Sequence, residues 1–398
     1  MKLQERVILH CDANNFYASV ESVYNKQLAG KPVAVSGNPK KRTGIILAKN
    51  EIAKKHGVST GEAIWQAKLK CPDLVCVSPN FALYEKYSHS LRKIYSTYTD
   101  RIEAFGIDEC WLDVSGSLRL FESGEKIAQE IRQRVKQELG ITVSIGVSFC
   151  KLFAKLASDM KKPDAITIIT KQDYKQKIYP LEISEIIGIG RRLKEHFNKL
   201  NINTLGDLAK ADTSVLENKF GIIGVELKEK LNGFDFDEVK LTQDEIKSVG
   251  NGTTTIIDIS SEEDVSKTVM FLCEKISSRL RKKQLLASAV GISIKTNTFK
   301  TFHHDKKFGY FTDQAKILHD EAMGLLKSFW TFGVEIRAIR VRSFNLKSAN
   351  DLIQDSMFSK ISKDDLGFSI DFLKNKYGQN IINVASSLKT NFISTDEE

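Results

Sequence analysis

Apolar and polar positions in the first half of the chain alternate in a pattern that predicts an α+β fold. A β-branched run at Val7–Asp12 ends on a carboxylate, and a second strand follows the glycine turn in Phe105–Val114. A third apolar run, Thr142–Val147, precedes a basic helix. Apolar residues three and four positions apart predict intervening helices, with inner faces at Tyr84, Tyr87, Leu91, Ile94 and Tyr98, and at Ile127, Ile131, Val135 and Leu139. This order predicts a ferredoxin-like (split βαβ) sheet with an insertion at about 14–81.

The second half predicts a small helical segment and then a second α+β domain. Residues 171–236 contain two glycine hairpins, Ile186–Arg192 and Phe220–Val225. After an acidic and basic linker, the expected elements are strand 249–257, helix 262–283, strands 289–295 and 303–311, helix 313–328 and strand 334–344. On the last strand, Ile339 and Val341 alternate with Arg340 and Arg342, so one face is apolar and the other cationic. A further helix is expected near 368–377.

Chain length and net charge indicate how many domains to expect and which kind of partner the protein binds. A chain of 398 residues predicts about three or four domains. Lys and Arg outnumber Asp and Glu by 59 to 50, and the net charge of +9 favours a polyanionic partner. We expect no membrane span and no signal peptide. The six cysteines form no CxxC pair, as expected of reduced thiols in a cytoplasmic protein.

Three carboxylates are the candidate catalytic residues. Asp12 lies at the end of one predicted strand. Asp108 and Glu109 are neighbours in the sequence and lie at the start of another predicted strand. Hard oxygen ligands that converge from two strands suit Mg²⁺, which takes further ligands from water and substrate phosphates. Alternatively, Asp108 and Glu109 form a solvated hairpin tip and Asp12 caps a helix. The presence of both clusters favours the metal site.

Two other features are candidate phosphate contacts. The hairpin with Gly188 and Gly190, followed by Arg191, would present backbone N–H groups to a phosphate, unless its glycines only permit close helix packing. The face with Arg340 and Arg342, extended by Lys295, could follow a phosphate backbone or be an ordinary solvated face.

Several motifs in a fixed order resemble the Y-family (DinB/UmuC-type) translesion DNA polymerases. The motifs are Asp12-x-x-x-Phe16-Tyr17-Ala18-Ser19-Val20-Glu21, Gly106-Ile107-Asp108-Glu109, and Gly146-Val147-Ser148-x-x-Lys151-x-x-Ala154-Lys155-x-Ala157-Ser158-Asp159-x-x-Lys162-Pro163. The resemblance covers about residues 6–346. The domains that it implies are a palm (1–15 and 82–170), fingers (16–81), a helix–hairpin–helix thumb (171–236), a linker (237–246), a DNA-binding little finger (247–346) and a C-terminal tail (347–398).

The resemblance implies template-directed transfer of dNTPs to a primer 3′-hydroxyl in low-fidelity synthesis past DNA damage, with two Mg²⁺ ions or Mn²⁺ in their place. The implied metal ligands are Asp12, the Ala13 carbonyl, Asp108 and Glu109. The implied nucleotide-binding residues are Asn15, Phe16, Tyr17, Lys54 and Lys162, with Tyr17 as the ring that crowds a ribose 2′-hydroxyl. The implied DNA-binding residues are Gly188, Gly190, Arg191, Lys295, Arg340 and Arg342. Primed DNA and dNTPs are the expected partners of a monomeric enzyme.

Two positions depart from the family pattern. Where many DinB-type enzymes have Tyr-x-x-Arg for the triphosphate, this chain has Glu51 and Lys54, and a lysine cannot make the bidentate contact of an arginine. Arg42 or Lys49 could share that task. Phe149-Cys150 precedes Lys151 where an asparagine often lies, which affects a packing or DNA contact.

Two alternative functions differ in whether they need the three carboxylates. A non-catalytic Y-family-like accessory protein would lack the acidic ligands, whereas another two-metal phosphoryl-transfer enzyme, such as a nuclease or nucleotide cyclase, would share them.

Beyond the last strand, Gln354-Asp355-Ser356-Met357-Phe358 resembles the peptide by which bacterial polymerases bind the sliding clamp. Alternatively, Met357 and Phe358 fold back onto the protein.

Overall fold

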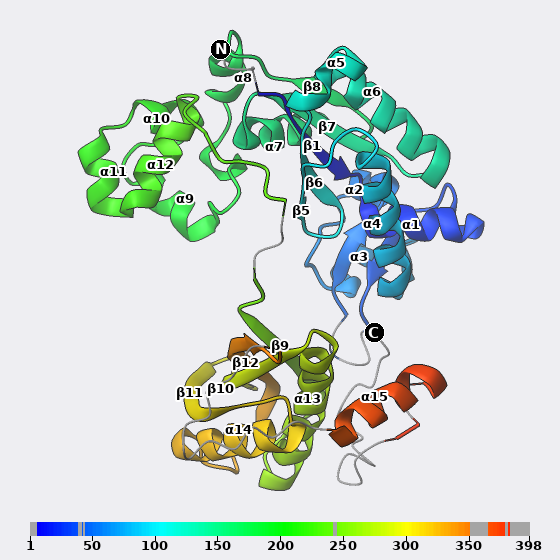
Figure 1. The fold of residues 1–398 in the computed structure, drawn as a ribbon, viewed down its shortest axis with the longest axis vertical. Coiled ribbons are helices and arrows are strands. Elements are labelled where there is room, and N and C mark those ends of the chain that lie inside the picture. Colours follow the sequence, from blue (N-terminus) through cyan, green and yellow to red (C-terminus); the bar gives the residue numbers. More distant parts are fainter. Residues whose placement is uncertain are drawn as a thin grey trace. The chain divides into compact units, whose positions relative to one another are not determined.

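The computed structural model describes residues 6–38, 42, 44–241, 245–350, 365–378 and 381–382. The chain divides into two compact units, residues 1–36 with 46–243 and residues 37–45 with 244–398. Both units combine helices with strands, which confirms the α+β multidomain prediction (Figure 1). Within the described residues, no helix is long and apolar enough to cross a membrane.

A five-stranded sheet in the order β5-β6-β1-β7-β8 forms the core of the first unit. Its strands are β1 (Ile8–Ala13), β5 (Ile102–Phe105), β6 (Glu109–Asp113), β7 (Val143–Ser148) and β8 (Ile166–Ile168). All neighbouring strands are antiparallel except β7 and β8. The strands that carry the two acidic motifs, β1 and β6, are therefore neighbours.

Different helices cover the two faces of this sheet. They are α4 (Phe81–Tyr95), α5 (Leu118–Phe121), α6 (Gly124–Arg134) with the π-helical turn Val135–Leu139, and α7 (Lys151–Met160). Leu9 and Cys11 share a buried cluster with residues of α4 and α6. Ile8 packs on α7, and His10 contacts a serine of α7. Because side chains alternate along a strand, Asp12 lies on the α7 face with Ile8 and His10.

Helix α7 approaches the sheet closely at Gly146 of β7. A Cβ atom at Gly146 would lie 1.9 Å from the carbonyl oxygen of Ala154, so a larger residue would push the helix away. Gly146 is the register partner of His10 on β1. The missing side chain thus lets polar residues of α7 reach the strand that carries Asp12.

The rest of the first unit is an insertion and a helical segment. The insertion contains α1 (Phe16–Tyr24), β2 (Val33–Ser36), β3 (Ile46–Lys49), α2 (Glu51–Lys55), α3 (Ile64–Lys70) and β4 (Val75–Val77), with the strands in the order β3-β2-β4. The helical segment contains α8 (Tyr174–Ile178), α9 (Arg191–Asn198), α10 (Leu205–Lys210), α11 (Thr213–Phe220) and α12 (Ile222–Leu231). These helices confirm the predicted small helical region, and their buried side chains form one cluster with residues of α7.

The chain that follows α12 is attached to the sheet. The Val239 side chain is only 4% exposed and packs in one cluster with Ile8, Trp111 and Ala154. Asp235 Oδ2 accepts a hydrogen bond from the backbone N–H of Leu152, 3.1 Å away, at the start of α7. The first part of the predicted linker (237–246) is therefore a docked segment of the first unit.

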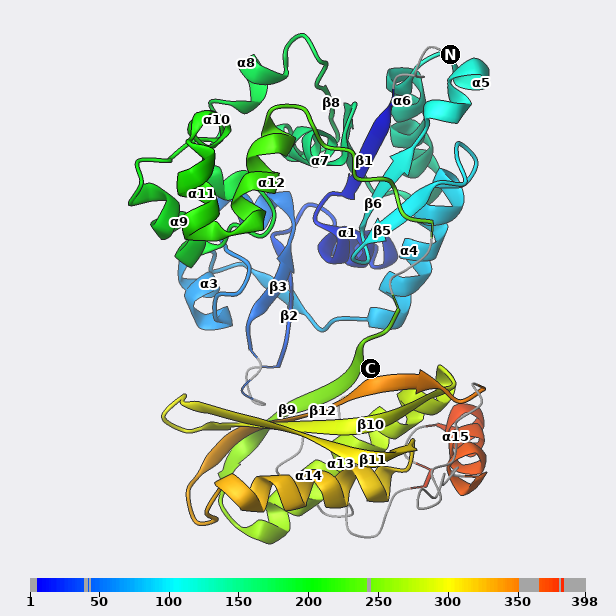
Figure 2. The same ribbon diagram turned by 60° about the vertical axis from the view of Figure 1, so that its left-hand side comes forward.

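The second unit is a four-stranded antiparallel sheet in the order β11-β10-β12-β9, with helices on one face (Figure 2). Its elements are β9 (Ser248–Ile259), α13 (Glu262–Lys282), β10 (Leu285–Thr296), β11 (Thr301–Thr312), α14 (Ala315–Phe329), β12 (Ile336–Ser348) and α15 (Asp365–Tyr377). Apolar residues of α13, α14 and the sheet form its core. Arg281 of α13 holds α15 through Asp371, with Nε 2.7 Å from Oδ2.

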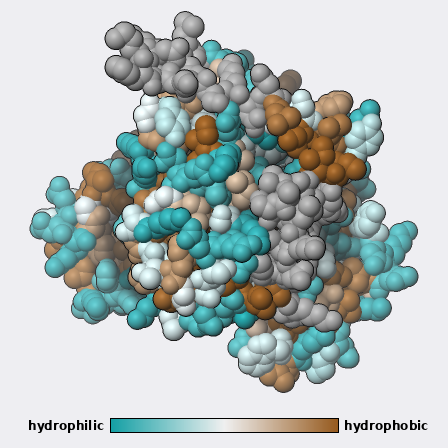
Figure 3. Space-filling view, turned by 90° about the horizontal axis from the view of Figure 1, so that it is seen from below, coloured by the Kyte–Doolittle hydropathy of each residue, from teal (hydrophilic) through white to brown (hydrophobic). Residues whose placement is uncertain are grey.

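Some hydrophobic side chains reach the surface. Figure 3 shows brown hydrophobic patches among hydrophilic residues on one face of the molecule. Phe236 and Leu366 are 77% and 70% exposed. Apolar atoms contribute a large part of the surface of any folded protein, so such residues define no site by themselves.

Candidate active site

The three predicted carboxylates lie together at one end of β1 and β6. Asp12 and Glu109 are register partners in this antiparallel pair, so both side chains share the α7 face. The backbone N–H of Ala13 donates to the carbonyl oxygen of Asp108, 3.2 Å away, which fixes the turn beside them. Long-range strand pairing thus joins two motifs that lie about a hundred residues apart in the sequence.

Two lysines compensate the carboxylates. Lys155 Nζ lies 2.7 Å from Glu109 Oε2 and 3.2 Å from both Asp12 Oδ2 and Asp159 Oδ2. Lys162 Nζ lies 2.7 Å from Asp12 Oδ2 and 2.8 Å from Asp159 Oδ1. The Lys155 side chain is only 9% exposed. Buried acids need such partners, because an unpaired buried charge is strongly unfavourable.

The charges shift the pKa values of these groups in opposite directions. Burial and the neighbouring Asp12 and Glu109 raise the pKa of Asp108 to about 6. Burial alone would also raise the pKa of Glu109, but contacts with His10 and Lys155 lower it to about 2. Burial alone would lower the pKa of Lys155, but the surrounding carboxylates raise it to about 12. Of the three carboxylates, Asp108 is therefore the one whose repulsion by its neighbours is least compensated by a nearby positive charge.

His10 joins Glu109 to helix α7. Its Nε2 atom lies 3.2 Å from Glu109 Oε2, and its Nδ1 atom lies 2.8 Å from Ser158 Oγ. The ring packs edge-on against Trp111, with centroids 4.9 Å apart. The sequence-based prediction gave His10, Lys155, Ser158 and Asp159 no role. The available signal was the spacing of the last three residues, which places them on one face of a helix.

The donor set of the site fits divalent cations. Carboxylate oxygens are the ligands that Mg²⁺ and Mn²⁺ prefer, and a cation would relieve the repulsion at Asp108. Within the described part of the chain, no three His, Cys, Asp or Glu side chains already surround a cation position. The ammonium groups of Lys155 and Lys162 lie on the oxygens of Asp12 and Glu109 instead.

Two adjacent aromatic residues follow β1, of which Phe16 lies in the core and Tyr17 lies nearer the surface. Phe16 packs in the hydrophobic core and is 4% exposed. Tyr17 is half-buried and stacks on Tyr84, with centroids 4.3 Å apart and planes 17° apart. Burial, and then the nearby Asp108, raises the pKa of Tyr17. Tyr17 is thus the more accessible of the two predicted nucleotide contacts.

Asn15 and Lys54 meet at Glu51. Asn15 Nδ2 donates to Glu51 Oε1 at 2.8 Å, and Lys54 Nζ lies 3.7 Å from the same oxygen. Lys49 Nζ donates to Thr60 Oγ1 at 3.0 Å, and burial and the charge of Lys54 lower the Lys49 pKa. The insertion therefore gathers two lysines near the end of β1.

The first glycine hairpin is open, whereas Gly224 of the second hairpin is closely packed. Cβ atoms at Gly188 and Gly190 would meet nothing within 4 Å, and Gly188 has a φ of +94°, which favours glycine. Helix α9 begins immediately afterwards at Arg191. At Gly224 a Cβ would lie 2.9 Å from Phe220 Cβ. Close packing therefore explains Gly224 but not the first hairpin.

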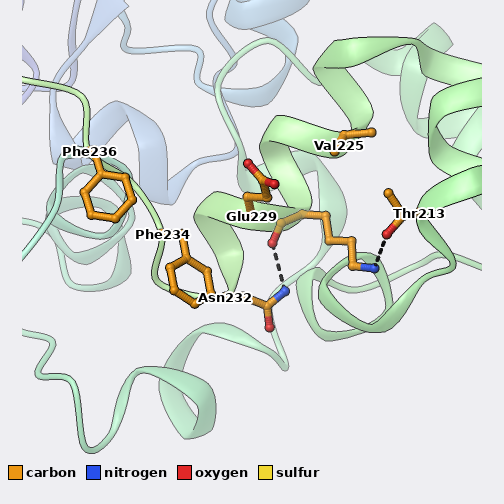
Figure 4. Close-up of a pocket in the computed structure, with 7 residues that line it drawn as sticks. Thr213, Val225, Glu229, Asn232, Phe234 and Phe236 are labelled. Atoms are coloured by element: carbon orange, nitrogen blue, oxygen red, sulfur yellow. Dashed lines mark hydrogen bonds between the residues drawn. The ribbon is translucent and has the colours of Figure 1, made fainter.

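The helical segment also contains a cavity of about 480 Å³ (Figure 4). Its lining residues are Thr213, Val225, Lys228, Glu229, Asn232, Phe234 and Phe236. Lys228 Nζ donates to Thr213 Oγ1 at 2.7 Å across it. None of the predicted site residues lines this cavity, so it is separate from the carboxylate cluster.

In the second unit, the predicted alternation on β12 is confirmed. Ile339 and Val341 are buried toward the helices, and Arg340 is exposed on the opposite face. Arg342 Nη2 lies 2.8 Å from Asp305 Oδ2, so its charge is partly neutralised. Lys295 Nζ lies 4.8 Å from the centroid of the Phe299 ring. Gln354, Met357 and Phe358 fall outside the described residues.

Comparisons with known proteins cover both units. The impB/mucB/samB family matches residues 11–159, and the impB/mucB/samB family C-terminal domain matches residues 246–357. A DNA polymerase IV of Acetivibrio thermocellus is 44% identical over 357 residues, which are 89% of this chain and 90% of the relative. A DNA polymerase IV of Clostridium acetobutylicum is 35% identical over 387 residues, which are 95% and 97% of the two chains.

A solved structure shares the fold. A Y-family DNA polymerase chimera superposes with a TM-score of 0.76 at 25% identity, over 86% of this chain and 99% of that chain. Relatives named as polymerases, together with the three carboxylates, exclude the non-catalytic alternative. The chain therefore belongs to the impB/mucB/samB family and is a Y-family, DNA-directed DNA polymerase of the translesion class.

Proposed function

We propose that Asp12, Asp108 and Glu109 carry template-directed nucleotidyl transfer with two divalent cations. The observation that supports this proposal is the pairing of Asp12 with Glu109 beside Asp108 at one strand end. Asp12, Asp108, Glu109 and the Ala13 carbonyl would hold the ions. Bound there, Mg²⁺ or Mn²⁺ in its place would supply the positive charge that lowers the pKa of the primer hydroxyl and neutralises the triphosphate.

Residues around the cluster would bind and select the dNTP. Lys162, which contacts Asp12, would pair with the triphosphate. Lys54 would add charge from the insertion, and Asn15 positions Glu51 beside it. Tyr17 would crowd a ribose 2′-hydroxyl, while the buried Phe16 supports the floor of the site.

We assign the palm to residues 1–15 and 82–170, the fingers to 16–81 and the thumb to 171–236. The little finger is residues 247–346, although β12 extends to Ser348. The open hairpin with Gly188, Gly190 and Arg191 would bind phosphates of the primed DNA. Lys295, Arg340 and Arg342 would do so from the little finger.

Two further proposals concern the setting of the enzyme. We propose that the enzyme is a monomer in the bacterial cytoplasm, where it has direct access to primed DNA and dNTPs. Gln354, Met357 and Phe358 would dock on the sliding clamp, which raises the local concentration at the primer end. Replacing all three by Ala should abolish clamp stimulation and leave single-nucleotide insertion unchanged. Equal stimulation of the variant and the parent chain would contradict this tether.

A primer-extension assay tests the main proposal against other two-metal enzymes. With primed template and one dNTP at a time, the chain should extend the primer only with the nucleotide that the template specifies. Chelation of divalent cations should stop extension. Shortening of the primer, or product formation independent of the template base, would instead indicate a nuclease or an untemplated transferase.

A further inference from the structure

Lys162 lies in the short connection between helix α7 and strand β8. Helix α7 ends at Met160 and β8 begins at Ile166, so Lys162 belongs to neither element. Its Nζ atom nevertheless lies 2.7 Å from Asp12 Oδ2. A lysine side chain has four rotatable bonds, so its ammonium group stays at one position only when the backbone beneath it is fixed.

Asn14 anchors this connection to the palm sheet. The Asn14 side chain is buried, and its Oδ1 atom accepts hydrogen bonds from the backbone N–H of Asp164 at 2.9 Å and from Thr142 Oγ1 at 3.0 Å. Its Nδ2 atom donates to Ser144 Oγ at 2.9 Å. Asn14 lies two residues after Asp12, so the catalytic strand end and the Lys162 connection share one support.

An ion-pair cluster anchors the same residue, Asp164, through its side chain. Arg132 Nε donates to Asp164 Oδ1 at 2.7 Å, and Lys136 Nζ donates to Oδ2 at 2.9 Å. The hydrogen bond from Arg132 lowers the pKa of Asp164. Asp164 has a φ of 53°, in the left-handed region, which Asp adopts more readily than most other non-glycine residues. Asp164 is thus held by both carboxylate oxygens and by its backbone N–H.

We propose that Asn14 and the Arg132–Asp164 ion pair are positioning residues that hold Lys162 for the triphosphate of the incoming nucleotide. They touch no reacting atom. This inference rests on the proposed function, in which Lys162 contacts the triphosphate. Loosening the anchor lowers the fraction of chains with Lys162 in place, so it weakens dNTP binding more than it slows the chemical step.

Arg132→Gln tests the inference, with Arg134→Gln as the matched control. Arg134 lies on the same helix and also has a carboxylate partner, Glu138 Oε1 at 2.7 Å, but it does not contact the Lys162 connection. In steady-state single-nucleotide insertion, Arg132→Gln should raise the KM for dNTP about fivefold, with kcat within about twofold of the parent value. Arg134→Gln should keep the parent KM, and Arg132→Lys should recover part of the loss. Equal KM changes in Arg132→Gln and Arg134→Gln would overturn the inference.

A double-mutant cycle with Lys162→Ala separates this inference from the proposed function. If Arg132 acts through Lys162, adding Arg132→Gln to Lys162→Ala should not raise the KM further. A further rise of the same size would overturn the positioning role alone. A Lys162→Ala chain with the parent KM would overturn both the proposed role of Lys162 and this inference. Should Arg132→Gln fail to fold, Asp164→Asn removes the other half of the ion pair, and the same cycle with Lys162→Ala distinguishes the same two outcomes.

Discussion

Tyr17 stacks on Tyr84, with ring planes 17° apart, and Tyr84 in turn donates a hydrogen bond to Glu21 Oε1 at 2.5 Å. Phe81 meets the Tyr17 ring edge-on. Tyr84 is fully buried, so the ring proposed to face the sugar rests on a rigid support from helix α4. A ring held in this way can exclude a 2′-hydroxyl because it cannot move aside.

Tyr17→Ala should therefore raise ribonucleotide insertion relative to deoxyribonucleotide insertion. The substitution removes the ring and leaves the carboxylates in place, so the ratio of kcat/KM for the two sugars should shift by about tenfold or more. Tyr24→Ala is the matched control, because Tyr24 lies at the end of the same helix and is 70% exposed. An unchanged ratio in Tyr17→Ala would mean that another residue selects the sugar.

The raised pKa of Asp108 predicts a pH-dependent stability. Between its ordinary value of 3.8 and about 6, the folded chain holds this proton more readily than the unfolded chain does. The contribution to stability is fully present below pH 3.8 and is lost as the pH rises through about 6. Without divalent cations, Asp108→Asn should melt a few degrees above the parent at pH 8 and by a clearly smaller margin at pH 5, where the loss is only partial. The same difference at both pH values would contradict the raised pKa.

Lys155→Met should destabilise the chain most when divalent cations are absent. The substitution removes the ammonium partner of Glu109 and one of the two partners of Asp12, which costs about 3 kcal/mol in typical buried pairs. Mn²⁺ or Mg²⁺ should restore part of the melting temperature, because the cation replaces the lost charge. Lys126→Met, which breaks an exposed pair with Glu122, serves as the control. Equal losses with and without the cation would contradict the compensation.

Arg340→Ala combined with Arg342→Ala should weaken DNA binding to many sequences alike. Each phosphate contact that is lost should reduce the salt slope of binding by about one. Lys316→Ala with Lys327→Ala removes the same charge from α14, on the helical face of the unit, and should leave the slope unchanged. If the arginine variant keeps the slope of the parent, the cationic face is an ordinary solvated surface.

The strands and their acidic ends were predictable because local patterns determine them. Continuous apolar runs beside Asp12 and Asp108 predict strands whatever lies elsewhere in the chain. The alternation of Ile339 and Arg340 likewise predicts two faces of a strand before any partner is known.

Contacts made at long range were not predictable in the same way. Lys155 meets Asp12 across more than a hundred residues, and only the close approach of α7 at Gly146 brings them together. Val239 lies in a segment of mixed charged and apolar residues, and its docking beside Ile8 and Trp111 joins positions far apart in the sequence. The support that Asn14 gives to Asp164 depends on strand register, which a motif does not contain.

The rate of single-nucleotide insertion by folded Asp108→Asn chain tests the central claim most directly. Glu125→Gln, which removes a charge from the surface of α6, is the matched control. If the three carboxylates hold the catalytic cations, Asp108→Asn should slow insertion by about a thousandfold or more, while Glu125→Gln should match the parent. A near-normal insertion rate in folded Asp108→Asn would contradict the assignment of this cluster as the active site.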